Sequence, residues 1–432
     1  METLYLGSTG PQVEYLQLAL QRAGFDAGEI DGIFGMKTQL ALQRFQRAKR
    51  LAADCVAGPQ SWQRLLAYLL GYVVHSVRKG DSAAKIAHSF TTSAQAIETA
   101  NPRLAQERLQ PGQDIIVPLG FDIVPVSVRY SSKLLNIVMD GLKSRYPFIT
   151  SQVIGHSVMG RQLHALQLGK GKTEVFYHAA HHANEWITVP LLLKFLENYA
   201  KAFVQKGKIY GIEATELYDN TTLYMTPLVN PDGVDLVTGA LCSSTRYYAQ
   251  AREYAKDYPD IAFPCGYKAN INGVDLNLNY PAGWETAKEI KCAQGYVSPA
   301  PRDFVGPGPL SEPEACAVFA FTRSRDFTMT LSYHTQGKEI YWRYGCCKPA
   351  HSYELAQIFA RASSYAVADP PENSSHAGYK DWFVMHYDRP GFTIEAGEGE
   401  NPLPLSQFEE IYADNAGIMA LGLKMMPLFK IC

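Results

Sequence analysis

The sequence predicts an α/β domain around a mixed, mostly parallel sheet, preceded by a small all-helical domain and a βααβ module. From about residue 124 onward, apolar runs rich in β-forming residues alternate with longer amphipathic stretches. Ahead of them, apolar residues at helical spacing fill the first seventy or so positions, and a short strand–helix–helix–strand pattern follows. We therefore expect three domains, spanning residues 1–71, 72–119 and 124–432.

The composition is that of a folded chain with a sizeable core. Of 432 residues, 47% are hydrophobic and 19% are charged, and 40 Lys and Arg residues nearly balance 42 Asp and Glu residues. That balance argues against a nucleic-acid binder that works by neutralising phosphates. The longest apolar run near the amino end, residues 65–74, is about half of what a bilayer span requires. The first residues show no basic stretch followed by an apolar one, so we expect no secretory signal.

The first domain reads as helical segments separated by glycine-rich turns. Val13, Leu16 and Leu20 fall at helical spacing, and Trp62 follows a Gly-Pro turn that starts another helix. The chain shows G-x-x-V-x-x-L-Q-x-x-L, D-G-x-F-G-x-x-T, F-Q and V-x-G-P-x-S-W in this order, over residues 6–70. This series resembles the peptidoglycan-binding domain of cell-wall hydrolases.

The second domain begins with an alternating strand at residues 74–77 and ends with another at residues 115–118. A Lys-Gly-Asp-Ser turn and two short helical stretches lie between them, which predicts a βααβ fold. The ordered set of turns resembles a LysM module, a family that binds N-acetylglucosamine-containing glycans. Ser82 and Ala84 replace the threonine and the bulky residue that are usual there, which affects the expected affinity more than the fold. No long repeat is evident.

Polar side chains follow the apolar runs of the third domain. His182 and Glu185 come after V-F-Y, the N-P-D-G segment at residues 230–233 comes after L-Y-M-T-P-L-V, His334 comes after F-T-M-T-L-S-Y, and Glu395 comes after G-F-T-I. Ligands of open α/β sheets collect at the carboxyl ends of the strands. We therefore expect these side chains to converge on one site.

His182 and Glu185 are three residues apart at a join from strand to helix, where an imidazole and a carboxylate can face one point. With His334 they would form a His₂Glu set that leaves a fourth position for water, which is the pattern of catalytic zinc. The eight scattered cysteines contain no C-x-x-C pair and indicate neither a thiolate site nor a disulfide framework. His178 reads as a packing residue at a strand end and His181 as a residue in solvent or behind the ligands, although spacing also allows His181 in place of His182.

Six motifs in this order carry a resemblance to one family: H-x-x-E-W-I-T, N-P-D-G, G-V-D-x-N-x-N, G-P-x-P-x-S-E, S-Y-H-T and F-T-I-E-A-G. Together they resemble the zinc carboxypeptidases, or funnelins, over nearly all of residues 124–432. The resemblance implies a carboxypeptidase-like mixed sheet flanked by helices, and one zinc ion per chain bound by His182, Glu185 and His334. It also implies Glu395 as the catalytic carboxylate.

This set of residues is suited to hydrolysis of a peptide bond. Zinc would lower the pKa of its bound water toward about 7, and Glu395 would take a proton from that water and pass one to the leaving amine. The family places an arginine shortly before the G-V-D segment, where this chain has Lys268. We therefore expect Lys268 to stabilise the oxyanion, with a solvated loop lysine as the alternative interpretation and Arg246 or Arg252 as substitutes in the role.

The departures from the family concern the substrate's terminal carboxylate. Carboxypeptidases hold it with Asn-Arg in G-V-D-x-N-R-N, whereas this chain keeps Asn277 and has Leu278 in place of the arginine. That change removes a bidentate partner for a carboxylate. Asn184 stands where the family's H-x-R-E arginine would be, and Tyr379 lies near the position of the substrate-capping tyrosine, with an offset. We therefore expect that the cleaved bond need not be C-terminal.

Two wall-binding modules and a domain without the clamp resemble the γ-D-glutamyl-L-diamino acid (diaminopimelate) endopeptidases associated with sporulating bacilli. The resemblance implies a zinc endopeptidase whose partners are peptidoglycan glycan strands and stem peptides, with no nucleic acid and no membrane. It also implies a cytoplasmic or sporulation-associated location. The candidate substrate-binding residues are Asn277, Asn230, Arg246, Tyr379 and Lys380, and the substrate's free carboxylates could meet Lys380, Arg343 or Arg389.

Two other functions stay open at this point. One is an ordinary zinc carboxypeptidase that removes C-terminal residues from wall peptides, and Leu278 counts against it. The other is a non-catalytic cell-wall-binding protein, and the retention of all three expected ligands and Glu395 counts against that.

Overall fold

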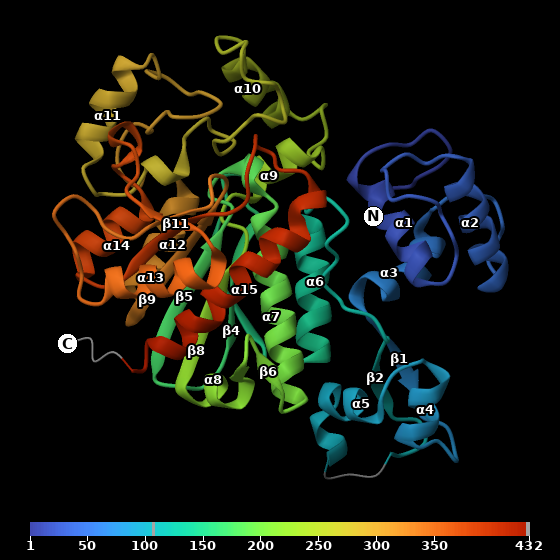
Figure 1. Cartoon of the computed structure of the whole chain (residues 1–432). Coiled ribbons are helices and arrows are strands. Elements are labelled where there is room, and N and C mark those ends of the chain that lie inside the picture. Colours follow the sequence, from blue (N-terminus) through green and yellow to red (C-terminus); the bar gives the residue numbers. More distant parts are fainter. Residues whose placement is uncertain (106–108, 429–432) are drawn as a thin grey trace. The chain divides into compact units, whose positions relative to one another are not determined.

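The computed structural model describes residues 1–105 and 109–428 (Figure 1). The chain divides into two compact units, Met1–Thr150 and Ser151–Cys432. Within the described residues, no helix combines the length and the apolarity needed to cross a membrane. None of the seven cysteines among the described residues forms a disulfide, and Cys432 lies outside those residues.

The first unit begins with the predicted helical domain. Its helices are α1 (Pro11–Arg22), α2 (Met36–Ala48) and α3 (Pro59–Leu70). Val13, Leu16 and Leu20 are fully buried along one face of α1, as helical spacing predicts. Proline occupies the first turn of α1 and of α3, where its missing N–H costs no hydrogen bond.

A buried glutamine organises the turn between α1 and α2. The Gln17 amide donates to Asp31 Oδ1 at 2.8 Å, to the Ile33 carbonyl at 3.2 Å and to Thr38 Oγ1 at 3.2 Å, and its oxygen accepts from the Gly32 N–H at 3.0 Å. These bonds satisfy every donor and the acceptor of a side chain that is 1% exposed.

The same arrangement recurs between α2 and α3. The Gln46 amide donates to Asp54 Oδ1 at 2.7 Å, to the Val56 carbonyl at 3.0 Å and to Ser61 Oγ at 3.0 Å, and its oxygen accepts from the Cys55 N–H at 3.1 Å. D-G-I-F-G-M-K-T and D-C-V-A-G-P-Q-S are therefore two copies of one turn. The sequence did not predict this short duplication, because the two copies share few identical residues.

The βααβ module follows as predicted. It consists of β1 (Tyr72–Ser76), α4 (Ala83–Ser89), α5 (Ala94–Ala100), a short 3₁₀ turn and β2 (Asp114–Pro118), with β1 antiparallel to β2. Its core contains Val77, Ile86, Ile97, Ile115 and Val117. Ser82 caps α4 by accepting from the Lys85 N–H, so serine in place of the usual threonine still starts the helix.

Helix α6 (Ser132–Arg145) belongs to the first unit, although the sequence predicted a domain start near residue 124. The helix packs against α3 and α5. The Arg145 guanidinium donates to the carbonyls of Gly71, Leu119 and Phe121 at 2.7–2.9 Å. These bonds tie α6 to the preceding modules, and the structural division therefore lies at residue 150.

An eight-stranded mixed sheet forms the centre of the second unit, in the order β11-β10-β12-β9-β5-β8-β4-β3. Strands β12, β9, β5 and β8 run parallel, β4 is antiparallel to β8, and β10 is antiparallel to β12. The strands are β3 (Thr150–His156), β4 (Gln162–Leu168), β5 (Thr173–Ala179), β8 (Thr221–Thr226), β9 (Phe327–His334), β10 (Glu339–Tyr341), β11 (Ala366–Ala368) and β12 (Gly391–Glu395). This arrangement confirms the predicted mixed sheet.

Helices cover the sheet (Figure 1). They are α7 (Thr188–Val204), α8 (Ala214–Asn220), α9 (Pro231–Thr238), α10 (Arg246–Ala255), α11 (Trp284–Ala293), α12 (Pro313–Arg323), α13 (Ser352–Ser363), α14 (Tyr379–Tyr387) and α15 (Phe408–Met425). Successive side chains of β5 point to opposite faces of the sheet. Phe176 packs against aromatic residues of α12 and α14 on one face, and on the other face the Tyr177 hydroxyl donates to the Met419 carbonyl in α15 at 2.9 Å. Central strands are thus buried on both sides.

The parallel strands end at one edge of the sheet. His182 lies three residues beyond β5, His334 is the last residue of β9, and Glu395 is the last residue of β12. His334 and Glu395 are direct neighbours in the parallel register. The fold therefore brings the predicted residues to one place, as the rule for open α/β sheets requires.

Candidate metal centre and its cavity

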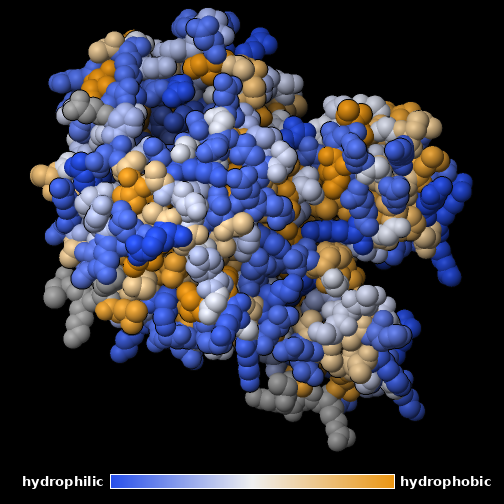
Figure 2. Space-filling model, in the orientation of Figure 1, coloured by the Kyte–Doolittle hydropathy of each residue, from blue (hydrophilic) through white to orange (hydrophobic). Residues whose placement is uncertain are grey.

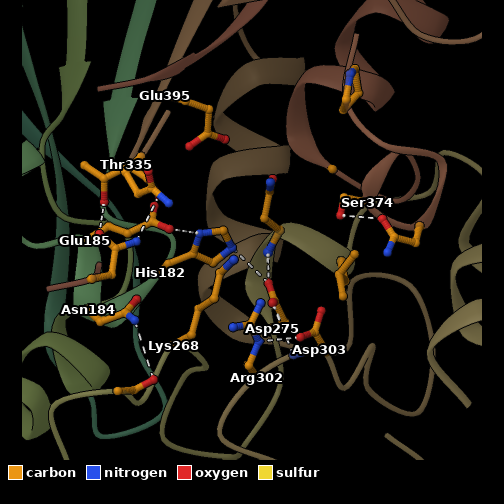
Figure 3. A pocket seen from close by; sticks show the side chains of 18 of the residues that line it. His182, Asn184, Glu185, Lys268, Asp275, Arg302, Asp303, Thr335, Ser374 and Glu395 are labelled. Carbon is orange, nitrogen blue, oxygen red and sulfur yellow. Dashed lines mark hydrogen bonds and ion pairs between the residues drawn. The ribbon is translucent and has the colours of Figure 1, made fainter. Parts of the chain in front are cut away.

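Two histidines and a glutamate converge at the carboxyl ends of β5 and β9. Figure 3 shows two of them, His182 and Glu185. The possible ligand atoms of His182, Glu185 and His334 all lie within 4.8 Å of one another, and the three side chains are buried. His182 Nδ1 is 2.8 Å from Glu185 Oε1, and His334 Nδ1 is 2.9 Å from Glu185 Oε2. The turn η2 (Ala183–Glu185) places the carboxylate beside the first imidazole.

The donor set fits a zinc ion. The two Nδ1 atoms are 3.0 Å apart and face the same carboxylate, which brings three electron-pair donors together in a buried space. On the far side of the ring, His182 Nε2 is 3.1 Å from Asp275 Oδ1. A proton on Nε2 bonded to that carboxylate leaves the Nδ1 lone pair free for a metal.

The neighbouring histidines His178 and His181 have other hydrogen-bond partners and lie outside the His-Glu-His group. His181 Nε2 is 2.9 Å from the Tyr280 hydroxyl, and His178 Nε2 is 3.0 Å from Ser332 Oγ. Both rings are completely buried, and burial holds the pKa of each imidazole well below its usual value. His178 therefore packs as expected, while His181 lies in the core and not in solvent.

Glu395 faces the cluster across a cavity of about 1040 Å³ (Figure 3). Burial raises the pKa of this carboxyl to about 8, and the nearby Glu185 carboxylate adds to the effect. In the space-filling view, hydrophilic residues surround the hollow beside α11 (Figure 2).

Lys268 also lines the cavity, beside His182. Its N–H donates to the Pro301 carbonyl at 2.8 Å, and its carbonyl accepts from the Ala183 N–H at 2.9 Å. Burial lowers the pKa of the ammonium, but the carboxylates of Asp275 and Glu185 outweigh it and raise the pKa above its usual value. Lys268 is therefore a fixed positive charge close to the expected ligands.

The two arginines considered as substitutes for Lys268 lie elsewhere. Arg246 and Arg252 are exposed on α10, and neither lines the cavity. Arg246 donates to the Tyr247 hydroxyl at 2.8 Å. Their position contradicts the prediction that Arg246 or Arg252 stabilises the oxyanion. It also contradicts the prediction that Arg246 contacts the substrate.

Two of the predicted substrate-binding residues line the cavity. Asn277 does so from η3 (Leu276–Leu278), and its Oδ1 accepts from the Tyr379 N–H at 3.1 Å. Lys380 does so from α14, where its Nζ donates to the Arg343 carbonyl at 2.7 Å and pairs with Asp381. Both are positioned by bonds to their surroundings before any substrate binds.

Two others are core residues, contrary to the prediction. Asn230 caps α9 and is fully buried, and its amide donates to the carbonyls of His181 and Ala269 at 3.1 Å. Tyr379 is also fully buried, with its hydroxyl 2.9 Å from Thr322 Oγ1. The polar atoms of both side chains form hydrogen bonds inside the fold, and neither residue lines the cavity.

The other two arginines proposed for the substrate's carboxylates do not line the cavity. Arg343 pairs with Asp369 at the surface. Arg389 pairs with Asp326 at 2.7 Å, immediately before β9 begins and therefore at the opposite end of the strand from His334. Neither Arg343 nor Arg389 is therefore placed to bind a carboxylate of a substrate in this cavity.

Several charged residues that line the cavity were not predicted from the sequence, among them Asp275, Lys291, Arg302 and Asp303. Burial opposes ionisation of Asp275, but His182 and Lys268 hold the pKa of its carboxyl well below the usual range. The G-V-D motif contained a signal for Asp275. The other three belong to residues 284–305, where no motif or hydrophobic period marks them.

Comparisons with known proteins agree with this geometry. Residues 135–417 match the zinc carboxypeptidase family, residues 9–65 match a peptidoglycan binding domain and residues 75–118 match the LysM domain. The chain is 41% identical over 283 residues to "Gamma-D-glutamyl-L-diamino acid endopeptidase 1" of Lysinibacillus sphaericus, covering 65% of this chain and 69% of that protein. It is 38% identical over 279 residues to YqgT of Bacillus subtilis, covering 63% of this chain and 72% of that protein.

The fold is similar to that of bovine thrombin-activatable fibrinolysis inhibitor in complex with a tick carboxypeptidase inhibitor. The TM-score is 0.52 at 20% identity, over 69% of this chain and 97% of that one. The match to the zinc carboxypeptidase model spans more than half of the sequence. With its His-Glu-His group suited to one metal ion, the chain belongs to the zinc carboxypeptidase family.

Proposed function

We propose that this protein hydrolyses the bond between the γ-carboxyl group of D-glutamate and a diamino acid such as diaminopimelate in peptidoglycan stem peptides. The metal cluster beside a second acid, at the edge of a peptide-sized cavity, carries the proposal that it is a hydrolase. The relative from Lysinibacillus sphaericus supports the choice of bond through its printed name, since the two chains are 41% identical over 283 residues. The peptidoglycan binding and LysM domains support the choice of polymer.

The catalytic roles follow from charge and position. A zinc ion held by His182, Glu185 and His334 would supply Lewis acidity and acidify a water molecule. Glu395 accepts a proton from the attacking water and returns one to the leaving amine, and its raised pKa suits both directions of transfer. Lys268 offers an ammonium to the negative charge that develops on the carbonyl oxygen.

The wall of the cavity supports an endopeptidase over a carboxypeptidase. Leu278 lies in an apolar cluster with Trp284, Ala287, Val305 and Ala377, so it offers no charge to a terminal carboxylate. Asn277 and the Lys380–Asp381 pair remain to contact polar groups of the diamino acid. This arrangement is suited to a substrate that carries several charged groups along its length.

The amino-terminal domains would hold the enzyme on glycan strands near the stem peptides that it cleaves. We therefore propose peptidoglycan as both the binding partner and the substrate. A cytoplasmic or sporulation-associated location, without nucleic-acid or membrane partners, stays a prediction.

Defined muropeptides test the proposal. The zinc-loaded protein is incubated with L-Ala-γ-D-Glu-meso-diaminopimelate and with the corresponding pentapeptide, and the products are identified by mass spectrometry. We expect L-Ala-D-Glu and the diaminopimelate-containing remainder from both. Release of only the C-terminal D-alanine from the pentapeptide would show an ordinary carboxypeptidase. No cleavage by protein that holds one zinc ion per chain would favour a wall-binding protein without catalysis.

A further inference from the structure

One arginine lies in the part of the cavity wall that the structure describes. Arg302 follows Pro301, whose carbonyl accepts from the Lys268 and Ala269 N–H groups, both at 2.8 Å. Two residues later the Phe304 carbonyl accepts from the Asp275 N–H at 2.8 Å. The segment that carries Arg302 is therefore fastened on both sides to the segment that carries Lys268 and Asp275.

The guanidinium has room for a ligand. The side chain of Arg302 is 46% exposed, whereas that of Lys291 is 7% exposed. Among the described residues, its hydrogen-bond partner is Asp303, reached through Nε. A partner at Nε leaves the guanidinium edge between the two Nη groups available, which suits a second, bidentate contact.

The carboxylates nearest to Arg302 are each shared between two cationic groups. Asp303 is shared between two cations, since Lys291 Nζ lies 2.6 Å from one of its oxygens and Arg302 occupies the other. Asp275 is likewise shared between the His182 ring and the nearby Lys268. Lys291 and Arg302 thus share the single carboxylate of Asp303, which favours an anionic ligand group beside Arg302.

The other cations at the site have different positions or partners. Lys268 lies beside the metal ligands, where the reacting carbonyl is expected. Lys380 is almost fully buried and already bound to Asp381 and to a carbonyl. Arg302 is therefore the group in this wall that combines a fixed charge, exposure to the cavity and unused donors.

We propose that Arg302 binds a free carboxylate of the substrate at a point separate from the bond that is cleaved. This inference rests on the proposed function for the identity of the substrate, whose tripeptide form has one free carboxylate on its γ-linked D-glutamate and two on its diaminopimelate. Arg302 is then a specificity residue that selects carboxylate-bearing peptides over their amidated forms. It takes over the charge recognition that Leu278 cannot provide.

Substrate and enzyme changes made together test this pairing. L-Ala-γ-D-Glu-meso-diaminopimelate and its three singly amidated forms are assayed with the wild type, Arg302→Gln, Arg302→Lys and the control Arg343→Gln. We expect one amidation to lower kcat/KM about 10- to 100-fold in the wild type and in the control, the size of a lost charge-assisted contact. That amidation should cost Arg302→Gln no more than about threefold, and Arg302→Lys should lie between.

Equal losses on all four substrates in Arg302→Gln would overturn the proposal, because they would show a structural role. An unchanged preference in Arg302→Gln would overturn it as well. Binding separates this test from that of the proposed function: zinc-loaded Glu395→Gln, with and without Arg302→Gln, is titrated calorimetrically with the same peptides. If the wild type cleaves none of them, the proposed function fails. An Arg302-dependent preference for one carboxylate in the titrations would still support the binding role, and its absence would refute it.

Discussion

At the scale of single residues, the orientation of His182 depends on a carboxylate behind it. Asp275 contacts Nε2 at 3.1 Å, while Nδ1 faces Glu185 at 2.8 Å. We expect Asp275→Asn to weaken zinc binding about 10- to 100-fold, because the amide cannot hold the imidazole in one tautomer as a carboxylate does. Competition against a chelator measures the affinity. Asp260→Asn, in the same cavity wall, is the matched control and should leave it unchanged.

Variants of the expected zinc ligands and of Glu395 should differ in how much zinc they hold. We expect His182→Ala and His334→Ala to lose both bound zinc and hydrolysis, because each removes one of three converging donors. Glu395→Gln should keep one zinc ion per chain and lose activity by several orders of magnitude. Elemental analysis with a product assay reads both quantities. Stoichiometric, tightly held zinc in either alanine variant would show that the ligand set is wrong.

At the scale of elements, the duplicated turn of the helical domain contains an imperfect copy. Cys55 has a φ of 62°, and the matching position in the first copy is Gly32 with a φ of 72°. A side chain in this left-handed region costs about 1 kcal/mol or more. We expect Cys55→Gly to raise the free energy of unfolding by about 0.5 to 1 kcal/mol after the entropy of the unfolded chain is included.

Gly32→Ala is the opposite change and should destabilise the domain. Its Cβ would lie 3.2 Å from Arg129 Nη2 and from a Glu14 carboxylate oxygen, in addition to the backbone strain. Urea unfolding of both variants measures the two shifts. Loss of stability in both would show that the two turns are not equivalent.

The first turn of α12 holds a buried carboxyl that should make stability depend on pH. Burial raises the pKa of Glu314 to about 8, although it accepts from the Val158 N–H at 3.1 Å and from Asn270 Nδ2 at 3.2 Å. A folded pKa above the unfolded value of 4.5 means that the folded state binds the proton more tightly. The stabilisation that the protonated Glu314 gives the folded state is therefore fully present below about pH 4.5 and is lost as the pH rises toward 8.

Glu314→Gln should remove this slope. We expect the free energy of unfolding of the variant to gain on the wild type, by on the order of a few kcal/mol, as the pH rises from 5 to 8. Urea titrations of both proteins across this range measure the difference in the free energy of unfolding. Any loss of zinc with pH affects both proteins and therefore cancels in this difference. A constant difference would show that Glu314 is ionised throughout.

At the scale of the whole molecule, binding and cleavage belong to different units. Residues 1–150 form a compact unit that contains the peptidoglycan binding and LysM matches, and the metal cluster lies in the other unit. We expect an excess of a fragment spanning residues 1–150 to slow digestion of intact sacculi by the full chain, because the two compete for glycan sites. Hydrolysis of a soluble tripeptide should not change. Equal inhibition of both reactions would contradict the division of labour.

Local patterns were sufficient to predict which residues converge at the candidate site. His182, Glu185, His334 and Glu395 each follow an apolar run, and parallel strands that share a sheet must end at one edge. Turn residues in a defined order were likewise enough to find the two amino-terminal modules. These inferences need only the period of a strand or helix and the chemistry of a few side chains.

The rest of the site depended on contacts between distant segments. Spacing allowed either His181 or His182 as a ligand, and the path of the chain after β5 turned one ring to Tyr280 and the other to Glu185. Tyr379 and Asn230 carry polar groups that packing buried. Arg302 lies in a segment without periodic pattern, and its place in the cavity follows from backbone hydrogen bonds to residues more than twenty positions away. Such bonds are made between irregular segments, and no local property of either segment predicts them.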